Sequence, residues 1–342
     1  MRPEPHSLSV SQRHYLRAAI APATRDAYNS ARENYQAHCL AQGHADYDIT
    51  SHRVAAWITE LAERGQHAGN TIAAYLSAIS TWWVERGAGD PKMQDASNPT
   101  QVAWVQRILT GIKNDRAQVD QNHRQARYVE PLLMSAVVGI KPHLKLYEDK
   151  DLTTFAAAAL GVAALLRPNA LLGNSRHPER GVLCDHLRFF TATASPMDRT
   201  ALGVPDYFTL FVPIDKTDQL RKGNTRVIAA ATAVQAVWAL WKKRPAGQRL
   251  FVQPSGEPLS TQSLVKRIKK AFRESGYAHA DKFAAKAFRR GGASTLTEAG
   301  VDGDAVAAAG NWSARAQTYK VYVGAQQRRQ QQLEASRKME YS

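Results

Sequence analysis

The chain has 342 residues, 44% of them hydrophobic, and a formal net charge of +15 at pH 7. This hydrophobic content excludes a globally disordered chain, and the length suits about two domains. The excess positive charge favours a polyanionic partner, with nucleic acid ahead of an anionic membrane surface.

The cysteines and the apolar runs limit the possible class of protein further. Cys39 and Cys184 lie far apart and lack the spacing of a zinc site, so we expect two reduced thiols and no metal. The N-terminus lacks the apolar stretch of a signal peptide. The longest apolar run, 153–166, is shorter than the ~20 residues of a membrane span. The sequence therefore predicts an intracellular protein without a membrane partner.

Amphipathic helices dominate the first third of the chain. A short helix is possible within residues 1–21, and Ser51 is an expected N-cap. Tyr28, Tyr35 and Trp83 are better explained as core residues than as base-stacking residues. Helical spacing predicts four longer helices, at about 24–39, 51–64, 71–85 and 101–113. Short connections between them indicate a helical bundle, which we place at residues 1–113.

The second domain is predicted at residues 128–342, after a basic and almost apolar-free linker at 114–127. Pro168 predicts a break at Arg167 with a short helix after it. Helices are expected at 129–139 and 152–166, strands at 182–190, 206–214 and 225–229, and helices again at 231–243, 260–275, 284–299, 303–309 and 314–335. The fold class is thus mainly α with a small antiparallel β-meander, and a Rossmann-like alternation is excluded.

Cations and glycines gather in the predicted 284–299 helix. Lys286 and Arg289 are three residues apart and share a helix face, whereas Arg290 is turned by about 100°. Gly291 and Gly292 follow, and glycines allow another backbone to approach closely. A solvated face is the ordinary interpretation of such a charge pair, but the small and apolar neighbours favour a functional site.

Other candidate residues have plain interpretations when taken singly. Arg167 closes an apolar helix, where it fits an arginine bonded to carbonyls or a carboxylate. Lys216 lies in a predicted hairpin turn, where a solubilising lysine is common. Together with Lys286, Arg289 and a later tyrosine, however, they supply the groups needed to attack a phosphodiester without a metal.

Four segments carry a resemblance to the tyrosine recombinases, or phage integrase family: LLRPNALLG, IDKTDQ, KAFRRGGAS and GNWSARAQTYKVYV. The resemblance spans roughly residues 22–335. Its motifs are most similar to those of recombinases from mobile elements such as cryptons and tyrosine-recombinase retrotransposons. It implies an N-terminal core-binding domain and an α+β catalytic domain. It also implies six catalytic residues in the family's order: Arg167, Lys216, Lys286, Arg289, Trp312 and Tyr322.

The chain departs from the family pattern at two positions. The first box normally carries an acidic residue three positions after its arginine, and this chain has Ala170 there. Lys286 stands in the place of a histidine. The nucleophile is also open, because Tyr319 and Tyr322 share a helix face. The spacing from Trp312 favours Tyr322.

The resemblance implies a metal-independent reaction through a 3′-phosphotyrosine, without a cofactor. Arg167 and Arg289 would hold the two non-bridging oxygens in bidentate fashion, and Trp312 would add an indole N–H. Nearby cations favour the phenolate of Tyr322. Lys216 would protonate the departing 5′ oxygen as a general acid.

The implied partner is double-stranded DNA, clamped by two domains. The 323–342 tail would pack on a neighbouring protomer, giving a dimer on one site and a tetramer in the synapse. The protein would be DNA-associated, in a nucleoid or a nucleus. Expected phosphate contacts are the basic side chains Arg53, Arg64, Lys266, Arg267, Lys269 and Lys270.

Three other functions remain open from the sequence. A DNA-binding module of the same ancestry could have lost activity through Ala170. A type IB topoisomerase-like enzyme would relax DNA without exchanging strands. A basic RNA-binding protein would leave the six ordered positions unexplained.

Overall fold

The computed structural model divides into two compact units, Met1–Arg127 and Tyr128–Ser342, each described here by itself. Lys216, Tyr319, Tyr322 and the predicted 314–335 helix lie outside the described residues. No helix in the described part of the chain combines the length and apolar content that a bilayer crossing needs. The structure describes residues 9–20, 22–44, 49–85, 90–92, 104–117, 129–173, 179–213 and 223–312.

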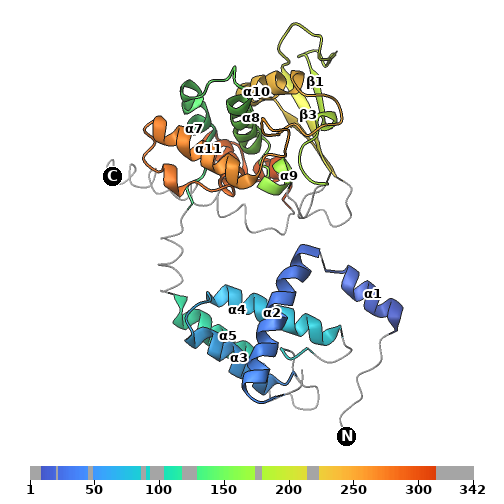
Figure 1. Ribbon diagram of the computed structural model, residues 1–342, viewed down its shortest axis with the longest axis vertical. Helices are drawn as coiled ribbons and strands as arrows, with labels where there is room; N and C mark the ends of the chain where they lie inside the picture. The colour runs from blue at the N-terminus through green and yellow to red at the C-terminus, as the bar shows by residue number, and fades with distance from the viewer. Residues whose placement is uncertain are drawn as a thin grey trace, which may run out of the picture. The chain divides into compact units, whose positions relative to one another are not determined.

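The first unit is all-helical in its described residues, as the periodicity predicts (Figure 1). Its helices are α1 (Val10–Ala18), α2 (Pro22–Ala41), α3 (Ser51–Glu63), α4 (Gly69–Val84) and α5 (Trp104–Asp115). The predicted cap of α3 is wrong by one residue. Thr50 is the extended residue before the helix, and its Oγ1 accepts a hydrogen bond from the N–H of Arg53 at 3.2 Å.

Aromatic residues form the centre of this bundle. Tyr35 is fully buried, and its ring meets that of Trp57 edge-on at 5.1 Å between centroids. The indole N–H of Trp57 donates to Asn34 Oδ1 at 2.8 Å. Trp83 is partly buried against the same core. Core packing is therefore confirmed for Tyr35.

The last helix of this unit runs into the segment predicted as a linker. Arg116, just after α5, donates from Nη1 to the carbonyl of Ala62 at 2.7 Å and from Nη2 to that of Gly65 at 3.0 Å. These bonds tie the end of α5 to the end of α3. These hydrogen bonds therefore hold the chain in place beyond the last apolar side chains of α5.

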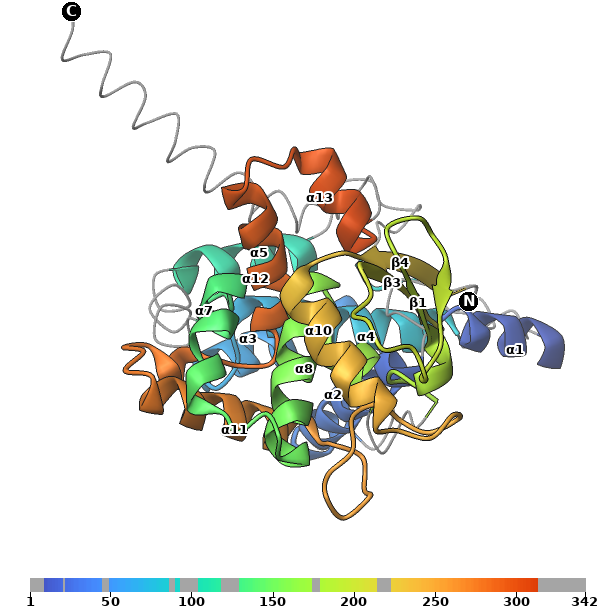
Figure 2. The ribbon, with the colours of Figure 1, turned by 90° about the horizontal axis from the view of Figure 1, so that it is seen from above.

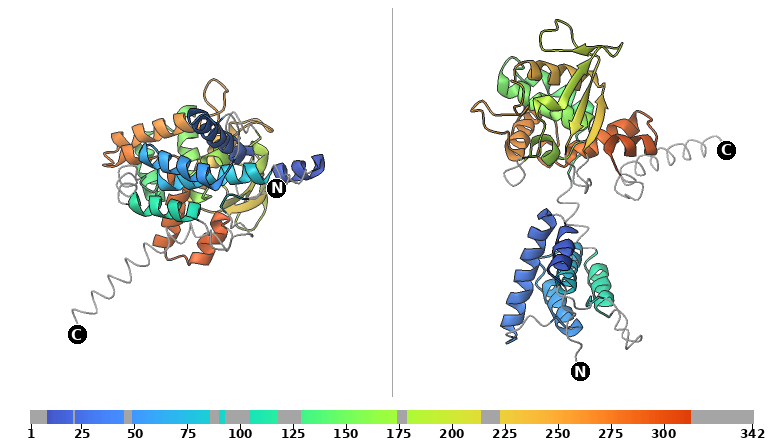
Figure 3. Two further views of the ribbon diagram at one scale, coloured as in Figure 1. Left: turned by 90° about the horizontal axis from the view of Figure 1, so that it is seen from below. Right: turned by 90° about the vertical axis from the view of Figure 1, so that its right-hand side faces the viewer.

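The second unit contains helices on one side of a small sheet, seen from further directions in Figures 2 and 3. Its helices are α7 (Met134–Gly139), α8 (Asp149–Ala163), α9 (Pro168–Leu172), α10 (Ala231–Lys242), α11 (Thr261–Glu274), α12 (Ala287–Glu298) and α13 (Gly303–Gly310). Short 3-10 turns lie at Lys141–His143, Cys184–His186 and Ala280–Lys282.

The sheet has four strands in the order β2-β1-β3-β4, all antiparallel, so the predicted meander is confirmed. The bounds are β1 (Leu187–Phe190), β2 (Pro196–Met197), β3 (Tyr207–Val212) and β4 (Asn224–Ile228). The prediction missed β2, which is too short for a periodic pattern.

Two predicted element starts are wrong. The strand expected at 182–190 begins only at Leu187, because Cys184–His186 forms a 3-10 turn. The helix expected at 129–139 begins at Met134. Pro131 disfavours helical geometry in the residue before it, and the extended chain there bonds elsewhere: the N–H of Glu130 donates to the carbonyl of Lys282 at 3.2 Å.

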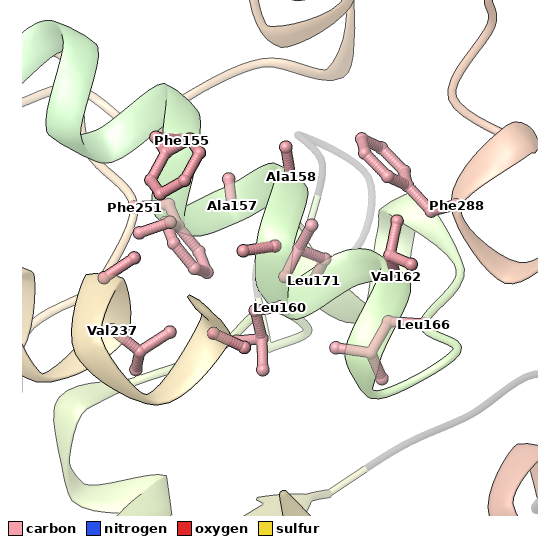
Figure 4. Packing of buried hydrophobic residues seen from close by; sticks show 14 of the residues in the cluster. Phe155, Ala157, Ala158, Leu160, Val162, Leu166, Leu171, Val237, Phe251 and Phe288 are labelled. Atoms are coloured by element: carbon pink, nitrogen blue, oxygen red, sulfur yellow. The ribbon is translucent and has the colours of Figure 1, made fainter. Parts of the chain in front are cut away.

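Helix α8 is the centre of the second unit, and residues 152–162 of it are all buried. Figure 4 shows Val237 of α10 and Phe288 of α12 packing on different sides of α8. Small residues make this close packing possible. A Cβ at Gly161 would lie 3.0 Å from the ring of Phe288. The other face of α10 covers the sheet, where the rings of Trp238 and Phe189 are 4.9 Å apart.

Candidate functional site

Four of the six predicted catalytic residues lie in the described part of the chain: Arg167, Lys286, Arg289 and Trp312. They come from three places in the second unit, namely the turn between α8 and α9, the start of α12 and the end of α13. Lys216 and Tyr322 lie outside the described residues.

Arg289 is the most firmly held of the four. Its side chain is on α12, and the residue is only 8% exposed. Nη1 donates to the carbonyl of Leu165 at 3.2 Å, and Nη2 donates to the carbonyl of Gly310 at 2.7 Å. The central guanidinium carbon lies 4.1 Å from the ring centroid of Trp312. Two directional bonds and one stacked ring therefore fix the plane of this cation.

The first of these carbonyls belongs to the end of α8. Leu165 is left-handed, with φ 49°. Its N–H donates to the carbonyl of Val162 at 3.1 Å, and the N–H of Leu166 donates to that of Gly161 at 2.9 Å. This pair of bonds closes the helix and leaves the later carbonyls without helical partners. One of them, on Leu165, is the acceptor for Arg289.

A leucine in the left-handed conformation costs about 1–2 kcal/mol, and glycine is the usual residue at this position. Burial offsets the cost here. Leu165 is 1% exposed and packs with Ala293 of α12 and Val306 of α13 in a separate apolar cluster. The side chain that strains the turn therefore also joins the three helices around Arg289.

The second carbonyl belongs to the end of α13, which closes in the same way. Asn311 is left-handed, with φ 51°, and its N–H donates to the carbonyl of Ala308 at 3.0 Å. The N–H of Trp312 donates to that of Ala307 at 3.0 Å. A Cβ at Gly310 would lie 1.8 Å from a ring atom of Trp312. Glycine at 310 thus lets the indole fold back over its own helix end.

The glycine pair after Arg289 has the role that the sequence predicts. A Cβ on Gly291 would lie 1.7 Å from the carbonyl oxygen of Leu132, and one on Gly292 would lie 2.3 Å from that of Val162. Two backbones therefore contact α12 where it carries Arg289. The close approach expected from the sequence is confirmed.

Arg167 lies two residues after Leu165. It is partly buried and extended, with φ −76° and ψ 148°, and it precedes Pro168 at the start of α9. Two residues span at most about 7 Å of chain. The backbone of Arg167 is therefore close to the carbonyl that holds Arg289. The break predicted at this position is confirmed.

Ala170 is 6% exposed and belongs to the main apolar core of the second unit. The position where the family pattern has an acidic residue is thus filled by a buried methyl group.

Lys286 and Arg290 flank Arg289 but have different surroundings. Lys286 is exposed, at the residue just before α12. Arg290 is directed elsewhere, as its helical position predicts, and its Nη1 donates to the carbonyl of Val129 at 3.0 Å. The same helix therefore offers an exposed lysine, a buried arginine and an arginine that ties down the start of the unit.

The predicted phosphate contacts on α11 differ in their availability. Lys266 and Lys270 are both exposed, and Nζ of Lys270 lies 3.6 Å from Oε1 of Glu274. Lys269 donates to the carbonyl of Asp281 at 2.9 Å. Burial lowers the pKa of Arg267. Lys266 and Lys270 are thus exposed, whereas Arg267 and Lys269 are partly buried.

The two predicted contacts in the first unit have near neighbours. Arg64 is exposed and bonded to Glu60. Arg53 is partly buried, with 3.4 Å between its Nη2 and Nδ1 of His44.

The sequence analysis missed Arg226. This arginine lies on β4, is 6% exposed, and its Nη1 donates to the carbonyl of Ala164, next to Leu165. The missed signal is an arginine at an inward position of a strand. Among the described residues, no group of His, Cys, Asp or Glu could hold a metal ion.

Comparison with known proteins finds a family model that matches part of the second unit. Residues 211–329 match the sequence model of the "Phage integrase family". No match was found among curated proteins. The mobile-element likeness of the motifs stays a prediction.

A solved structure with a TM-score above 0.5 shares the fold. The XerH site-specific recombinase bound to palindromic difH substrate, in a post-cleavage complex, is 13% identical, with 84% of this chain and 72% of that chain covered and a TM-score of 0.52. A lambda integrase dimer bound to a COC′ core site is 14% identical, with 93% and 78% covered and a TM-score of 0.49. The predicted fold class is confirmed.

Proposed function

We propose that the chain is a tyrosine recombinase, which cuts and rejoins duplex DNA at specific sites through a 3′-phosphotyrosine; the match of residues 211–329 to the phage integrase family model supports this proposal. One observation carries the proposal. Arg289 is held by two helix ends and one ring, and one of its acceptor carbonyls belongs to Leu165, two residues before Arg167. An oriented arginine pair is what a phosphate in its transition state requires.

Arginine suits this task better than lysine does. The transition state of phosphoryl transfer spreads negative charge over the non-bridging oxygens, and the planar guanidinium fork matches two oxygens at once. Arg289 is fixed before any substrate binds, so little reorganisation is needed during the reaction. Preorganised donors of this kind lower a barrier by about 3–4 kcal/mol each.

The proposed reaction proceeds in two balanced steps. Tyr322 gives its proton to water, its oxygen attacks phosphorus, and the bond from phosphorus to the 5′ oxygen breaks. Lys216 gives a proton to that 5′ oxygen, while Lys286 stabilises the phenolate. A 5′-hydroxyl of another strand then returns its proton to Lys216 and attacks the phosphotyrosine, and the released tyrosine oxygen takes up a proton from water. No metal takes part in either step.

The contacts of Trp312 support a positioning role in addition to the donor role expected from the sequence. Its ring faces the guanidinium of Arg289, and its backbone closes α13. The contact supports a positioning role, in which the indole keeps Arg289 in the plane that the phosphate needs. A ring face over a guanidinium contributes about 0.5–2 kcal/mol, depending on its desolvation.

The remaining expectations complete the proposal. Residues 1–113 would serve as the core-binding domain on duplex DNA, and the tail 323–342 would contact a neighbouring protomer. The active assembly would be a dimer on each site and a tetramer in the synapse.

A nicked suicide duplex tests this function directly. The wild-type chain should form a covalent adduct that migrates above the free protein in a denaturing gel, with EDTA present throughout. Tyr322→Phe should abolish the adduct, and Tyr319→Phe should keep it. The reverse pattern would move the nucleophile to Tyr319. If the wild-type chain forms no adduct on the DNA that flanks its gene, the proposed enzymatic activity is wrong.

One observation favours a second function. The buried methyl of Ala170 replaces an acidic group of the family pattern, so the chain could be a DNA-binding protein with weakened catalysis. This function predicts salt-dependent DNA binding and no adduct. Supercoiled plasmid in the same assay would reveal relaxation without strand exchange, the mark of a topoisomerase-like enzyme.

A further inference from the structure

Among the described residues, the buried positions on the inner face of the small sheet are apolar except for Arg226. Phe208, Leu210 and Val212 of β3 are buried, and so is Ile228 of β4. Arg226 lies between them on the same face, because it pairs with Leu210 across the strands. A buried guanidinium is costly, and a leucine or methionine would fill this place without that cost. The arginine therefore needs a specific explanation.

Its hydrogen bond provides one. Nη1 of Arg226 donates to the carbonyl of Ala164, and Nη1 of Arg289 donates to the next carbonyl, that of Leu165, at 3.2 Å. Both carbonyls lie at the end of α8, beyond the bonds that close the helix. The C-terminal end of a helix carries partial negative charge, so cations are favoured there. Two arginines thus hold one turn through adjacent carbonyls.

The two arginines that bind this turn come from different parts of the fold. Arg226 belongs to the sheet, and Arg289 belongs to α12. The chain leaves this turn through Leu166 and reaches Arg167 immediately. Any shift of the turn would therefore move Arg167 relative to Arg289.

We propose that Arg226 is a positioning residue, which fixes the α8–α9 turn so that Arg167 and Arg289 meet the same phosphate. Arg226 itself does not touch the substrate, since it is buried under the sheet. The inference rests on the proposed function, because it concerns the geometry of that reaction.

A double-mutant cycle on adduct formation tests the proposal. Arg226→Met should slow the adduct at saturating duplex by about 10- to 100-fold, because a displacement of about 1 Å can cost that much. Its DNA affinity should stay within about twofold of wild type. In an Arg167→Lys background, Arg226→Met should change the rate by no more than about twofold, because the residue acts through Arg167.

Arg290→Met is the matched control, since it removes another arginine-to-carbonyl bond, to Val129, away from this turn. It should leave the rate within about threefold of wild type. Equal slowing by Arg290→Met and Arg226→Met would indicate a general folding effect and overturn the proposal. Multiplying effects of the 226 and 167 variants would overturn it as well.

Two safeguards separate the possible failures. If Arg226→Met does not fold, the same cycle is run with Arg226→Lys, which keeps a charged donor and should again lose rate only when arginine stands at 167. If the wild-type chain forms no adduct, the proposed function fails. If the wild type reacts and the cycle is additive, only the inference about Arg226 fails.

Discussion

At the scale of single residues, Arg289 shows how a buried cation is kept in one orientation. The carbonyls that hold it belong to Leu165 and Gly310, which are far apart in sequence. A left-handed residue makes each carbonyl available to it: Leu165 itself, after α8, and Asn311, after α13. The orientation of this side chain, which we propose to be catalytic, thus depends on how two helices end.

The face of Trp312 gives the first residue-scale prediction. Trp312→Phe keeps a ring over Arg289 and should form the adduct within about threefold of the wild-type rate. Trp312→Ala removes the ring and should react about tenfold more slowly or worse, since a cation–π contact contributes about 0.5–2 kcal/mol. The measurement is the adduct rate at saturating duplex. Equal loss in both variants would instead assign the effect to the indole N–H.

The contact at Gly291 gives a second prediction, on stability. A methyl group at this position would lie 1.7 Å from the carbonyl oxygen of Leu132, so α12 must move away. Gly291→Ala should lower the free energy of unfolding by about 2–3 kcal/mol. Gly139→Ala is the control, because nothing lies within 4 Å of the added methyl. Chemical denaturation measures both, and similar stability of the two variants would contradict the close contact.

At the scale of elements, local hydrogen bonds decide where helices begin. Helix α3 begins after Thr50, which is extended and accepts from the N–H of Arg53. Ser51, the residue favoured by the pattern, is already inside the helix. Both residues carry a hydroxyl, so composition alone does not distinguish them.

The cap can be tested by a pair of substitutions. Thr50→Ala should destabilise α3 by about 1 kcal/mol, because the Arg53 N–H loses its acceptor. Ser51→Ala should have a smaller effect, since this side chain is not the cap. Amide hydrogen exchange within α3 measures the difference in the full chain. Faster exchange in Ser51→Ala than in Thr50→Ala would return the cap to Ser51.

The 3-10 turn before β1 carries a pH-dependent contact. Burial lowers the pKa of His186 below its ordinary value of 6.5, although the charge of Asp185 acts in the opposite direction. Its Nδ1 accepts a hydrogen bond from the N–H of Leu183 at 3.1 Å, which requires that nitrogen to be unprotonated. The folded state therefore favours the neutral ring.

This contact makes the folded chain less stable in acid. Below about pH 6.5 the unfolded chain binds a proton that the folded chain resists, so the free energy of unfolding falls as the pH falls. Above that pH both states hold the ring neutral, and the contribution is complete. His186→Asn should therefore lose less stability than wild type between pH 7.5 and 5.5 in thermal melts. Exposed His143→Asn is the control, and an equal change in both variants would contradict the prediction.

At the scale of the whole molecule, the chain combines an all-helical unit with a unit in which helices cover a small sheet. Their charge excess suits a DNA partner. The accessible cations are fewer than the sequence list, because Lys269 is partly buried and bonded to the carbonyl of Asp281 while Lys266 and Lys270 are exposed. Exposure rather than charge alone should decide which of them binds phosphate.

Salt dependence of DNA binding tests this distinction. Lys266→Ala should weaken binding to all duplexes alike and reduce the slope of log K against log salt by about 1. Exposed Lys243→Ala, at the end of α10, should leave the slope unchanged. Fluorescence anisotropy over a salt series gives both slopes. An unchanged slope in Lys266→Ala would exclude this lysine from the interface.

Local sequence patterns predicted much of the secondary structure of this protein. Helical periodicity located most helices, and Pro168 located the break at Arg167, because a proline ring cannot continue a helix. The order of motifs indicated the family. The two-residue strand β2 was too short for any pattern to reveal.

Only the tertiary structure decided how Arg289 is held and that Arg226 shares the task. Both arginines donate to backbone carbonyls, at Ala164, Leu165 and Gly310. Every residue has a carbonyl, so such acceptors leave no signature in the sequence. Which of them is available depends on where helices end and which elements pack together, and folding alone determines that.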